Sequence, residues 1–277
     1  MISPMLLKEI KDKDELKDRT KLFQVKEDGI RLLLHVKGGK VVGMFSRSGR
    51  PVGFLFPELR EIEFPGLDMA VIDGEATVMD ENGRSVFYGG IDQRSHSFHP
   101  ERLKSHPVTF LPFDLIYLNG KSIKHKPYSE RLQMLQDLVK PIKNLKVVET
   151  SNDGEALWNK VKTEDREGIV IKDPNAPYEE GVRSNRYQKL KNYKEVVVTV
   201  DKTEENPKGL KIYGTGTVNG ETVDVEAQCA GVDHIEIGTQ IKVTYMQVTR
   251  NKETGRVSVR QPVITKESKI EGGLIEG

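Results

Sequence analysis

The chain has 277 residues, of which 36% are hydrophobic and 31% charged, a balance typical of one large or two modest folded domains. No apolar run approaches the ~18–20 residues of a bilayer span, and the first residues lack a leader pattern, so we expect a cytoplasmic protein without a membrane partner. A single cysteine, Cys229, excludes an internal disulfide. The 43 Lys and Arg nearly balance the 42 Asp and Glu, so only the placement of charge could favour a nucleic-acid partner.

Strand patterns dominate the first two thirds of the chain, and they are separated by Gly-Gly and Asn-Gly pairs that favour hairpin turns. The predicted strands are 30–36, 40–46, 71–79, 85–88 and 108–118. Helical spacing is confined to three stretches, 58–62, 130–139 and 154–162. The last stretch follows Asn152 and has Glu155 three residues on, which resembles a capping box.

After Tyr193 the pattern consists of strands alone, separated by turn residues. These predicted strands are 195–200, 210–218, 221–229, 240–248 and 256–263. Five short strands in about 80 residues are typical of a small closed barrel such as an OB fold. We therefore expect an α+β chain, with residues 1–193 forming antiparallel sheets with few helices and residues 194–277 forming an all-β barrel. Residues 196–277 hold 10 Lys and Arg against 12 Asp and Glu, which places the cations for an anionic ligand in the first domain.

The segment Lys-Glu-Asp-Gly-Ile-Arg at 26–31 lies between two predicted strands. One interpretation is a charged hairpin end in which Asp-Gly makes the turn. The other is chemical, with Lys26 as a nucleophile. Because a lysine amine is protonated at neutral pH, the second interpretation requires neighbouring cations or a metal that help it lose a proton.

Polar residues follow in or beside later strands. Arg47 ends a strand within Ser-Arg-Ser-Gly, where its guanidinium could reach a phosphate or ribose oxygen. Glu75 lies inside an apolar strand and Glu167 opens another, and a buried carboxylate needs a hydroxyl, a cation or a metal as partner. Phe113 offers an aromatic face for stacking. Together these residue types are those that a nucleotide and its metal would require.

Lys189 and Lys191 are two residues apart in a strand-like segment, so we expect both side chains on one face. Two neighbouring ammonium groups repel unless an anion lies between them, and a phosphate fits that role. The same pair would also lower the pKa of a nearby lysine.

The motifs KEDGIR, SRSG, DGE, FD, EGIVIK and KLK, in this order over residues 26–191, resemble the nucleotidyltransferase motifs of ATP-dependent DNA ligases. RNA ligases and mRNA-capping guanylyltransferases belong to the same superfamily. The resemblance implies a nucleotidyltransferase domain with an ATP-grasp-like fold, followed by an OB-fold domain.

The resemblance also implies the site residues. Lys26 would attack the α-phosphate of ATP and hold AMP through a phosphoramidate bond. Phe113 would stack on adenine, Glu75 would contact the ribose, and Gln24 and Val25, directly before the lysine, would also bind the nucleotide. The implied reaction transfers AMP from the lysine to a 5′-phosphate, and a 3′-hydroxyl then attacks with release of AMP.

The remaining implied nucleotide-binding residues are cations: Arg31, Arg47, Lys189 and Lys191. The arginines would contact the nucleotide and the 5′-phosphate of the nick, and the lysines would contact the α-phosphate. Glu75 and Glu167 would form a metal site for Mg²⁺, with Mn²⁺ as an alternative.

The sequence departs from the family pattern in two places. Gln24 stands where many ligases have a glutamate on the adenine amino group, although an amide oxygen can accept the same hydrogen bond. The family's last motif, Arg-x-Asp/Glu-Lys, is not legible near the end of the chain, where only Lys266 and Lys269 are available.

We therefore expect an ATP-dependent ligase that seals nicks in duplex DNA, acting as a monomer without a protein partner. The first alternative is an RNA ligase or a capping-type guanylyltransferase of the same superfamily. The second is a non-catalytic barrel protein that binds single strands, which would leave Lys26 without a function and the two strand carboxylates unexplained.

Overall fold

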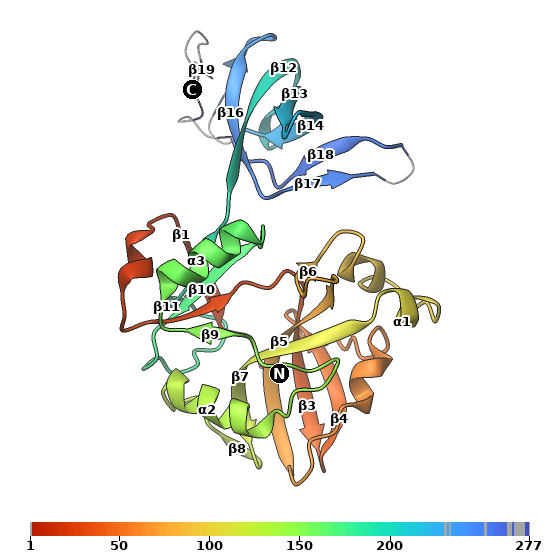
Figure 1. Ribbon diagram of the computed structural model, residues 1–277, viewed down its shortest axis with the longest axis vertical. Helices are drawn as coiled ribbons and strands as arrows, with labels where there is room; N and C mark the ends of the chain where they lie inside the picture. The colour runs from red at the N-terminus through yellow and green to blue at the C-terminus, as the bar shows by residue number, and fades with distance from the viewer. Residues whose placement is uncertain are drawn as a thin grey trace. The chain divides into compact units, whose positions relative to one another are not determined.

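The computed structural model of the chain describes residues 2–229, 232, 234–251, 254–264 and 268, and the backbone of 275 and 276. The chain divides into two compact units, Met1–Asn192 and Tyr193–Gly277 (Figure 1). Lys266 and Lys269, the residues available for the last family motif, lie outside the described residues. Within the described part of the chain, every helix is too short or too polar to span a membrane.

Two sheets form the first unit. One sheet has five strands in the order β1-β11-β10-β2-β9. Their bounds are Leu6–Ile10 (β1), Arg183–Lys191 (β11), Gly168–Lys172 (β10), Leu22–Val25 (β2) and Thr150–Ser151 (β9). Strand β1 runs parallel to β11, and all other pairs are antiparallel. This sheet therefore joins the first residues of the chain to the segment that carries the paired lysines.

The second sheet has the order β4-β3-β5-β7-β8, with β6 paired to β5, and every pair is antiparallel. The bounds are Lys40–Ser46 (β4), Ile30–Lys37 (β3), Met69–Met79 (β5), Val108–Leu118 (β7), Lys121–Ser122 (β8) and Ser85–Val86 (β6). Four predicted strands, 30–36, 40–46, 71–79 and 108–118, lie within these elements. The fifth prediction, 85–88, forms only the short strand β6.

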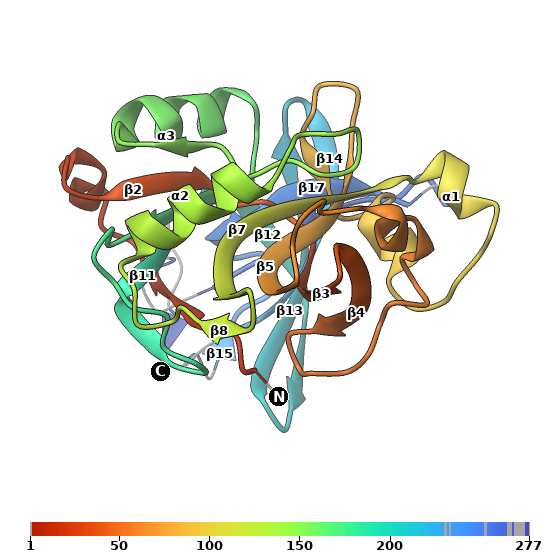
Figure 2. The ribbon, with the colours of Figure 1, turned by 90° about the horizontal axis from the view of Figure 1, so that it is seen from below.

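The helices of the first unit are few and short, as the sequence predicts. The α-helices are Arg102–Ser105 (α1), Tyr128–Leu138 (α2) and Gly154–Thr163 (α3), and the 3₁₀ turns are Asp14–Lys17 (η1), Pro57–Glu61 (η2) and Ile91–Arg94 (η3). Helix α2 packs beside β7, and α3 packs beside β2 and β10 (Figure 2). The predicted cap of α3 is wrong by one residue, because the carboxylate of Asp153, and not Asn152, accepts the hydrogen bond from the Ala156 amide at 3.0 Å.

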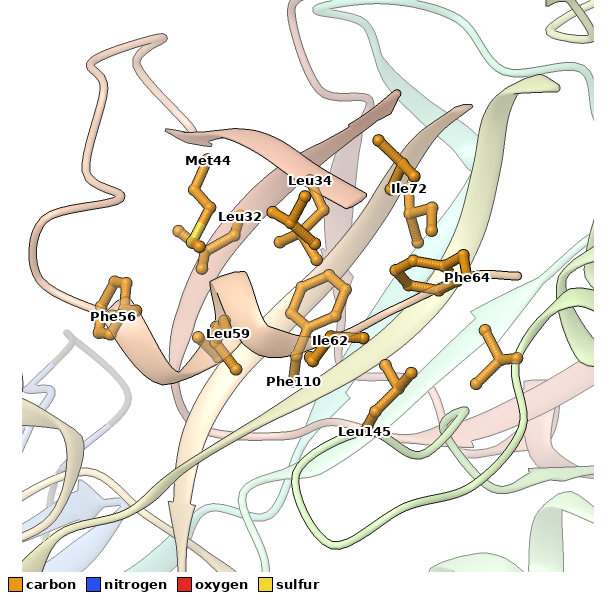
Figure 3. Packing of buried hydrophobic residues seen from close by; sticks show 14 of the residues in the cluster. Leu32, Leu34, Met44, Phe56, Leu59, Ile62, Phe64, Ile72, Phe110 and Leu145 are labelled. Atoms are coloured by element: carbon orange, nitrogen blue, oxygen red, sulfur yellow. The ribbon is translucent and has the colours of Figure 1, made fainter. Parts of the chain in front are cut away.

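The main core of the first unit lies on one face of the second sheet. Leu32 and Leu34 of β3 project toward the 3₁₀ turn η2, where Phe56, Leu59 and Ile62 are buried against them (Figure 3). Since side chains alternate along a strand, the intervening residues of β3 and β5 point to the opposite face. That opposite face looks toward the first sheet and carries the polar residues described below.

The second unit is a curled sheet with strand order β16-β12-β13-β14-β18-β17, in which β14 and β18 run parallel and the other neighbouring strands run antiparallel. The bounds are Gln240–Tyr245 (β16), Lys194–Asn206 (β12), Gly209–Val218 (β13), Glu221–Gln228 (β14), Val257–Arg260 (β18) and Gln247–Arg250 (β17); β15 (His234–Ile235) pairs with β19 (Ile275–Glu276). Two hydrogen bonds between Thr244 and Val263 bring the segment after β18 back to β16, so the sheet curls toward closure as in an OB fold. The predicted strand 240–248 is in fact two strands that break at Met246.

Candidate active site

A cavity of about 650 Å³ lies between the two sheets of the first unit. Both sheets contribute to its wall, since β2, β10 and β11 come from one sheet and β3, β5 and β7 from the other. The residues at the cavity that the sequence predicts as site residues are Gln24, Val25, Lys26, Arg31, Arg47, Glu75, Phe113 and Lys189. Glu167 reaches the same place through its contact with Lys26, and Lys191 joins Lys189 at a shared carboxylate.

The loop that carries Lys26 is held in place from three sides. The Lys26 amide donates to the Gly168 carbonyl at 2.9 Å, and the Asp28 amide donates to the Ser85 hydroxyl at 2.9 Å. A Cβ at Gly29 would collide with the Ala76 carbonyl oxygen and with the Glu75 side chain, so only glycine lets this loop lie against β5. The backbone therefore presents the lysine at a fixed place beside Glu75.

The Lys26 ammonium is 2.7 Å from Oε2 of Glu167, and the exposed fractions of the two side chains are 20% and 9%. Burial by itself would lower the pKa of Lys26, but Glu167 and Glu75 outweigh it, and the net pKa is raised. Lys191 and Lys26 do disfavour each other's charge, as the sequence predicts, but in the ligand-free protein this effect is smaller than that of the carboxylates. The nearer carboxylates control the charge of Lys26 and keep it protonated.

Glu75 lies on the strand face that looks into the cavity. Burial raises the pKa of Glu75 to about 8, against the opposing effect of Lys26 and Arg31, and the nearby Glu167 raises it further. Burial likewise raises the pKa of Glu27, whose Oε2 is buried without a hydrogen-bond partner. Glu75 and Glu27 are therefore two carboxylates at the cavity that are costly to ionise while no ligand is present.

Lys189 and Lys191 project to the same face of β11, as the strand alternation predicts. The carboxylate of Glu9 in β1 lies 3.0 Å from the ammonium of Lys189 and 3.9 Å from that of Lys191. The anion that two adjacent ammonium groups require is therefore supplied by the protein. The pKa of Lys191 is lowered, because burial and the neighbouring charge of Lys189 both lower it and together outweigh the raising effect of the Glu9 carboxylate.

The two predicted arginines occupy different settings. Arg31 donates from Nε and Nη2 to both oxygens of the buried Asp73, at 2.9 and 2.6 Å, and from Nη1 to the Met5 carbonyl at 2.7 Å. This fork satisfies the Asp73 carboxylate, which also accepts from the Tyr178 hydroxyl at 2.6 Å, so much of the hydrogen-bonding capacity of Arg31 is used within the protein. Arg47, by contrast, is exposed at the cavity.

An aromatic group with a buried lysine forms one wall of the cavity. The Lys172 ammonium is 4.8 Å from the ring centroid of Phe113, 4.2 Å from that of Tyr128 and 5.0 Å from that of Tyr187. Lys172 also donates to the Phe113 carbonyl at 3.3 Å. Burial lowers the pKa of Lys172 to about 7.

Asp114 links the walls of the site across three elements. Its carboxylate accepts from Nε and Nη2 of Arg131 in α2, at 2.8 and 3.1 Å, and from the Tyr187 hydroxyl of β11 at 3.0 Å. Both members of the ion pair are fully buried, so removal of either would leave an unpaired charge in the interior. The residue after Phe113 is therefore an anchor for the wall that carries the ring.

The residues at the site that the sequence-based prediction does not include are Glu9, Lys172, Tyr128 and Thr150 and, in the supporting walls, Asp73, Arg131 and Tyr187. Lys172 could have been found, because it closes the EGIVIK motif and shares a strand face with Val170. Glu9 could not, since only the pairing of β1 with β11 brings it to the lysines.

The described residues contain no group of three or more His, Cys, Asp or Glu side chains arranged to hold a metal ion. Glu75 and Glu167 are two oxygen donors, and magnesium is commonly bound by one or two carboxylates together with substrate phosphates and water. The donor set at Lys26 therefore fits magnesium held jointly with a nucleotide.

Residues 4–191, which include all of these groups, match the family described as ATP dependent DNA ligase domain. The chain belongs to the ATP-dependent DNA ligase family. It is 35% identical over 222 residues to the SPbeta prophage-derived DNA ligase-like protein LigB of Bacillus subtilis (strain 168), covering 79% of this chain and 78% of that protein.

One further relative and one solved structure show how far the likeness extends. The DNA ligase of Nitrosopumilus maritimus (strain SCM1) is 30% identical over 203 residues, covering 69% of this chain but only 34% of that ligase, so the chain spans about a third of its length. A solved structure from work on DNA binding with a minimal scaffold by Lig E DNA ligases has a TM-score of 0.66 at 18% identity, covering 95% of this chain and 98% of the other. This likeness shows the fold of an adenylation domain followed by a curled sheet consistent with an OB fold.

Proposed function

We propose that this chain seals nicks in duplex DNA with ATP, through a covalent AMP intermediate on Lys26. The observation that carries the proposal is the placement of Lys26 at a cavity of nucleotide size, hydrogen bonded to Glu167 at 2.7 Å. A lysine in a purely structural ion pair would not need an adjoining cavity with further cations and an aromatic wall.

In the first step the Lys26 amine attacks the α-phosphorus of ATP, forming a P–N bond while the bond to the β-phosphate oxygen breaks and pyrophosphate leaves. The amine must first lose a proton, and Glu167 is in hydrogen-bonding distance to accept it. Lys189 and Lys191 supply the positive charge for the phosphate oxygens once the nucleotide replaces Glu9 between them. Phe113 offers its ring to the base.

Glu75 and Glu167 would hold magnesium, which when bound supplies charge neutralisation for the phosphate oxygens. The same positive charge would offset the field of these two carboxylates at Lys26. Loss of that field favours the neutral, nucleophilic amine.

In the later steps a 5′-phosphate oxygen of the nick attacks the adenylyl phosphorus and the P–N bond breaks. The 3′-hydroxyl then attacks the 5′-phosphorus, the new phosphodiester forms and AMP leaves. Arg47 is exposed at the cavity, where it can bind the 5′-phosphate from outside, whereas Arg31 supports the wall through Asp73.

The first step is tested by incubating the protein with ATP labelled at the α-phosphate in the presence of magnesium. We expect an acid-labile covalent label on the wild-type protein and none on Lys26→Ala. Lys104→Ala, which removes an exposed lysine away from the cavity, serves as the matched control and should label normally. An unlabelled wild-type protein, or equal labelling of Lys26→Ala, would contradict the proposal.

The substrate is tested by comparing nicked DNA duplexes with nicked RNA duplexes of the same sequence. We expect faster sealing of DNA. Preferred sealing of RNA would instead support an RNA ligase, and labelling by GTP in place of ATP would support a capping-type guanylyltransferase.

A further inference from the structure

The Gln24 side chain is almost fully buried in β2, with 2% of its surface exposed, yet it forms part of the cavity wall. Its amide nitrogen donates to the hydroxyl oxygen of Tyr128 at 2.9 Å and to that of Thr150 at 2.9 Å. Both hydrogens of the amide group are thereby used within the protein.

The two hydroxyl groups can only accept from Gln24, because their own protons are used elsewhere. The Tyr128 hydroxyl donates to the Phe113 carbonyl at 3.0 Å, and the Thr150 hydroxyl donates to the Val148 carbonyl at 3.2 Å. A carbonyl oxygen has no proton to give, so neither hydroxyl bond can be reversed. Burial also holds the pKa of Tyr128 well above its usual range, so the phenol keeps its proton.

This network determines which end of the amide is presented to the cavity. Rotation of the Gln24 amide by half a turn would break both nitrogen bonds and place its oxygen against two hydroxyls that donate elsewhere. Among the described residues, none donates a hydrogen bond to Gln24 Oε1, and Gln24 lines the cavity. The cavity therefore meets an acceptor at this position.

We propose that Tyr128 and Thr150 are positioning residues that select adenine over guanine by holding the Gln24 amide with its oxygen toward the base. Adenine carries a 6-amino donor where guanine carries a 6-oxo acceptor, so an amide fixed in this orientation bonds adenine and opposes guanine. A glutamate at position 24 would present only acceptors, whereas a glutamine requires such a lock because it can turn either end to the ligand. This inference rests on the proposed use of ATP.

The network also sets the size of the expected effect. Each hydrogen bond to the amide nitrogen contributes a factor of about 3–10 to the preference for the observed orientation. Removing one hydroxyl should lower the ratio of kcat/KM for ATP to that for GTP by about 3–10-fold. Removing both should lower it by about 10–100-fold, mainly through better use of GTP.

The test measures formation of the covalent nucleotide adduct from ATP and from GTP by the wild-type protein, Tyr128→Phe, Thr150→Val and the double variant. Phe keeps the ring that packs against Tyr187, and Val keeps the shape of threonine, so each change removes only a hydroxyl. Thr150→Ser restores the hydroxyl and should retain the wild-type ratio. Thermal unfolding of each variant shows that the comparison is made on folded protein.

A fall in the ATP:GTP ratio in Tyr128→Phe and Thr150→Val, restored in Thr150→Ser, supports the inference. An adduct from ATP with an unchanged ratio in both single variants, or equal losses with both nucleotides, overturns it while leaving the proposed function intact. Absence of any adduct in the wild-type protein overturns the proposed function and this inference with it.

Discussion

Replacing Glu75 by glutamine is expected to stabilise the ligand-free protein at alkaline pH, although it removes a carboxylate that we assign to the nucleotide and its metal. Burial raises the pKa of Glu75 from the ordinary 4.5 to about 8. Between these two pH values the folded protein retains a proton that the unfolded chain has released, so the free energy of unfolding falls as the pH rises. Above pH 8 the whole loss is present, and glutamine does not incur it.

The magnitude follows from the same shift. At ~1.4 kcal/mol for each tenfold change in proton affinity, a rise in the pKa from 4.5 to about 8 corresponds to about 5 kcal/mol. Water in the cavity and relaxation of the side chain reduce this penalty, so we expect Glu75→Gln to raise the free energy of unfolding by about 2–3 kcal/mol at pH 8.5. At pH 5, where folded Glu75 is protonated, the gain should be close to zero.

The assay is thermal or urea unfolding, followed by circular dichroism, at pH 5 and pH 8.5 with a chelator present and no nucleotide. Glu61→Gln, an exposed glutamate, is the matched control and should change stability little at either pH. The same Glu75→Gln protein should form the AMP adduct much more slowly. Equal stability changes at the two pH values, or a lower stability of Glu75→Gln at pH 8.5, would refute the reasoning.

Three further changes test other parts of the site. Glu9→Gln should lower the KM for ATP by about 2–5-fold in adduct-formation kinetics, because the Glu9 carboxylate that competes with the nucleotide phosphates for Lys189 is removed. An unchanged or higher KM would count against this competition. Lys172→Met should raise the free energy of unfolding most below pH 7, where the folded protein carries the buried ammonium charge. Urea titrations should show this gain shrinking toward pH 10. A gain that does not depend on pH would exclude charge burial as its cause. Asp73→Asn should destabilise the protein by about 3 kcal/mol in the same assay because Arg31 loses its partner, and a change below about 1 kcal/mol would show that this pair contributes little.

Strand alternation and motif order were sufficient to predict much of the architecture. The paired lysines share a face because a strand alternates with a period of two, and Asp73 and Glu75 share the cavity face of β5 for the same reason. The fold class, an adenylation domain followed by a curled OB-like sheet, is confirmed by the described structure and by its likeness to a solved ligase. Local patterns of this kind depend on neighbours in sequence and can be predicted from it.

The electrostatic state of the site depends on contacts that local patterns do not contain. Lys26 remains protonated because Glu167, 141 residues later in the chain, lies against it. Glu9 reaches Lys189 only through the parallel pairing of β1 with β11. The partners of Gln24 come from a helix and from a two-residue strand that carries almost no strand signal. Such details require the three-dimensional arrangement.

The Glu9 carboxylate between the lysines of β11 has a consequence for how the protein should respond to salt. An enzyme whose cations face bulk solvent must release mobile ions when a polyanion binds, and its affinity falls steeply as ionic strength rises. Here the lysines already have a counter-ion that is covalently part of the chain, with one carboxylate reaching both ammonium groups. Binding of a triphosphate is then an exchange of one anion for another inside the protein, and little change in the number of bound salt ions accompanies it. Capture of the nucleotide should consequently vary less with salt than capture of the nucleic acid.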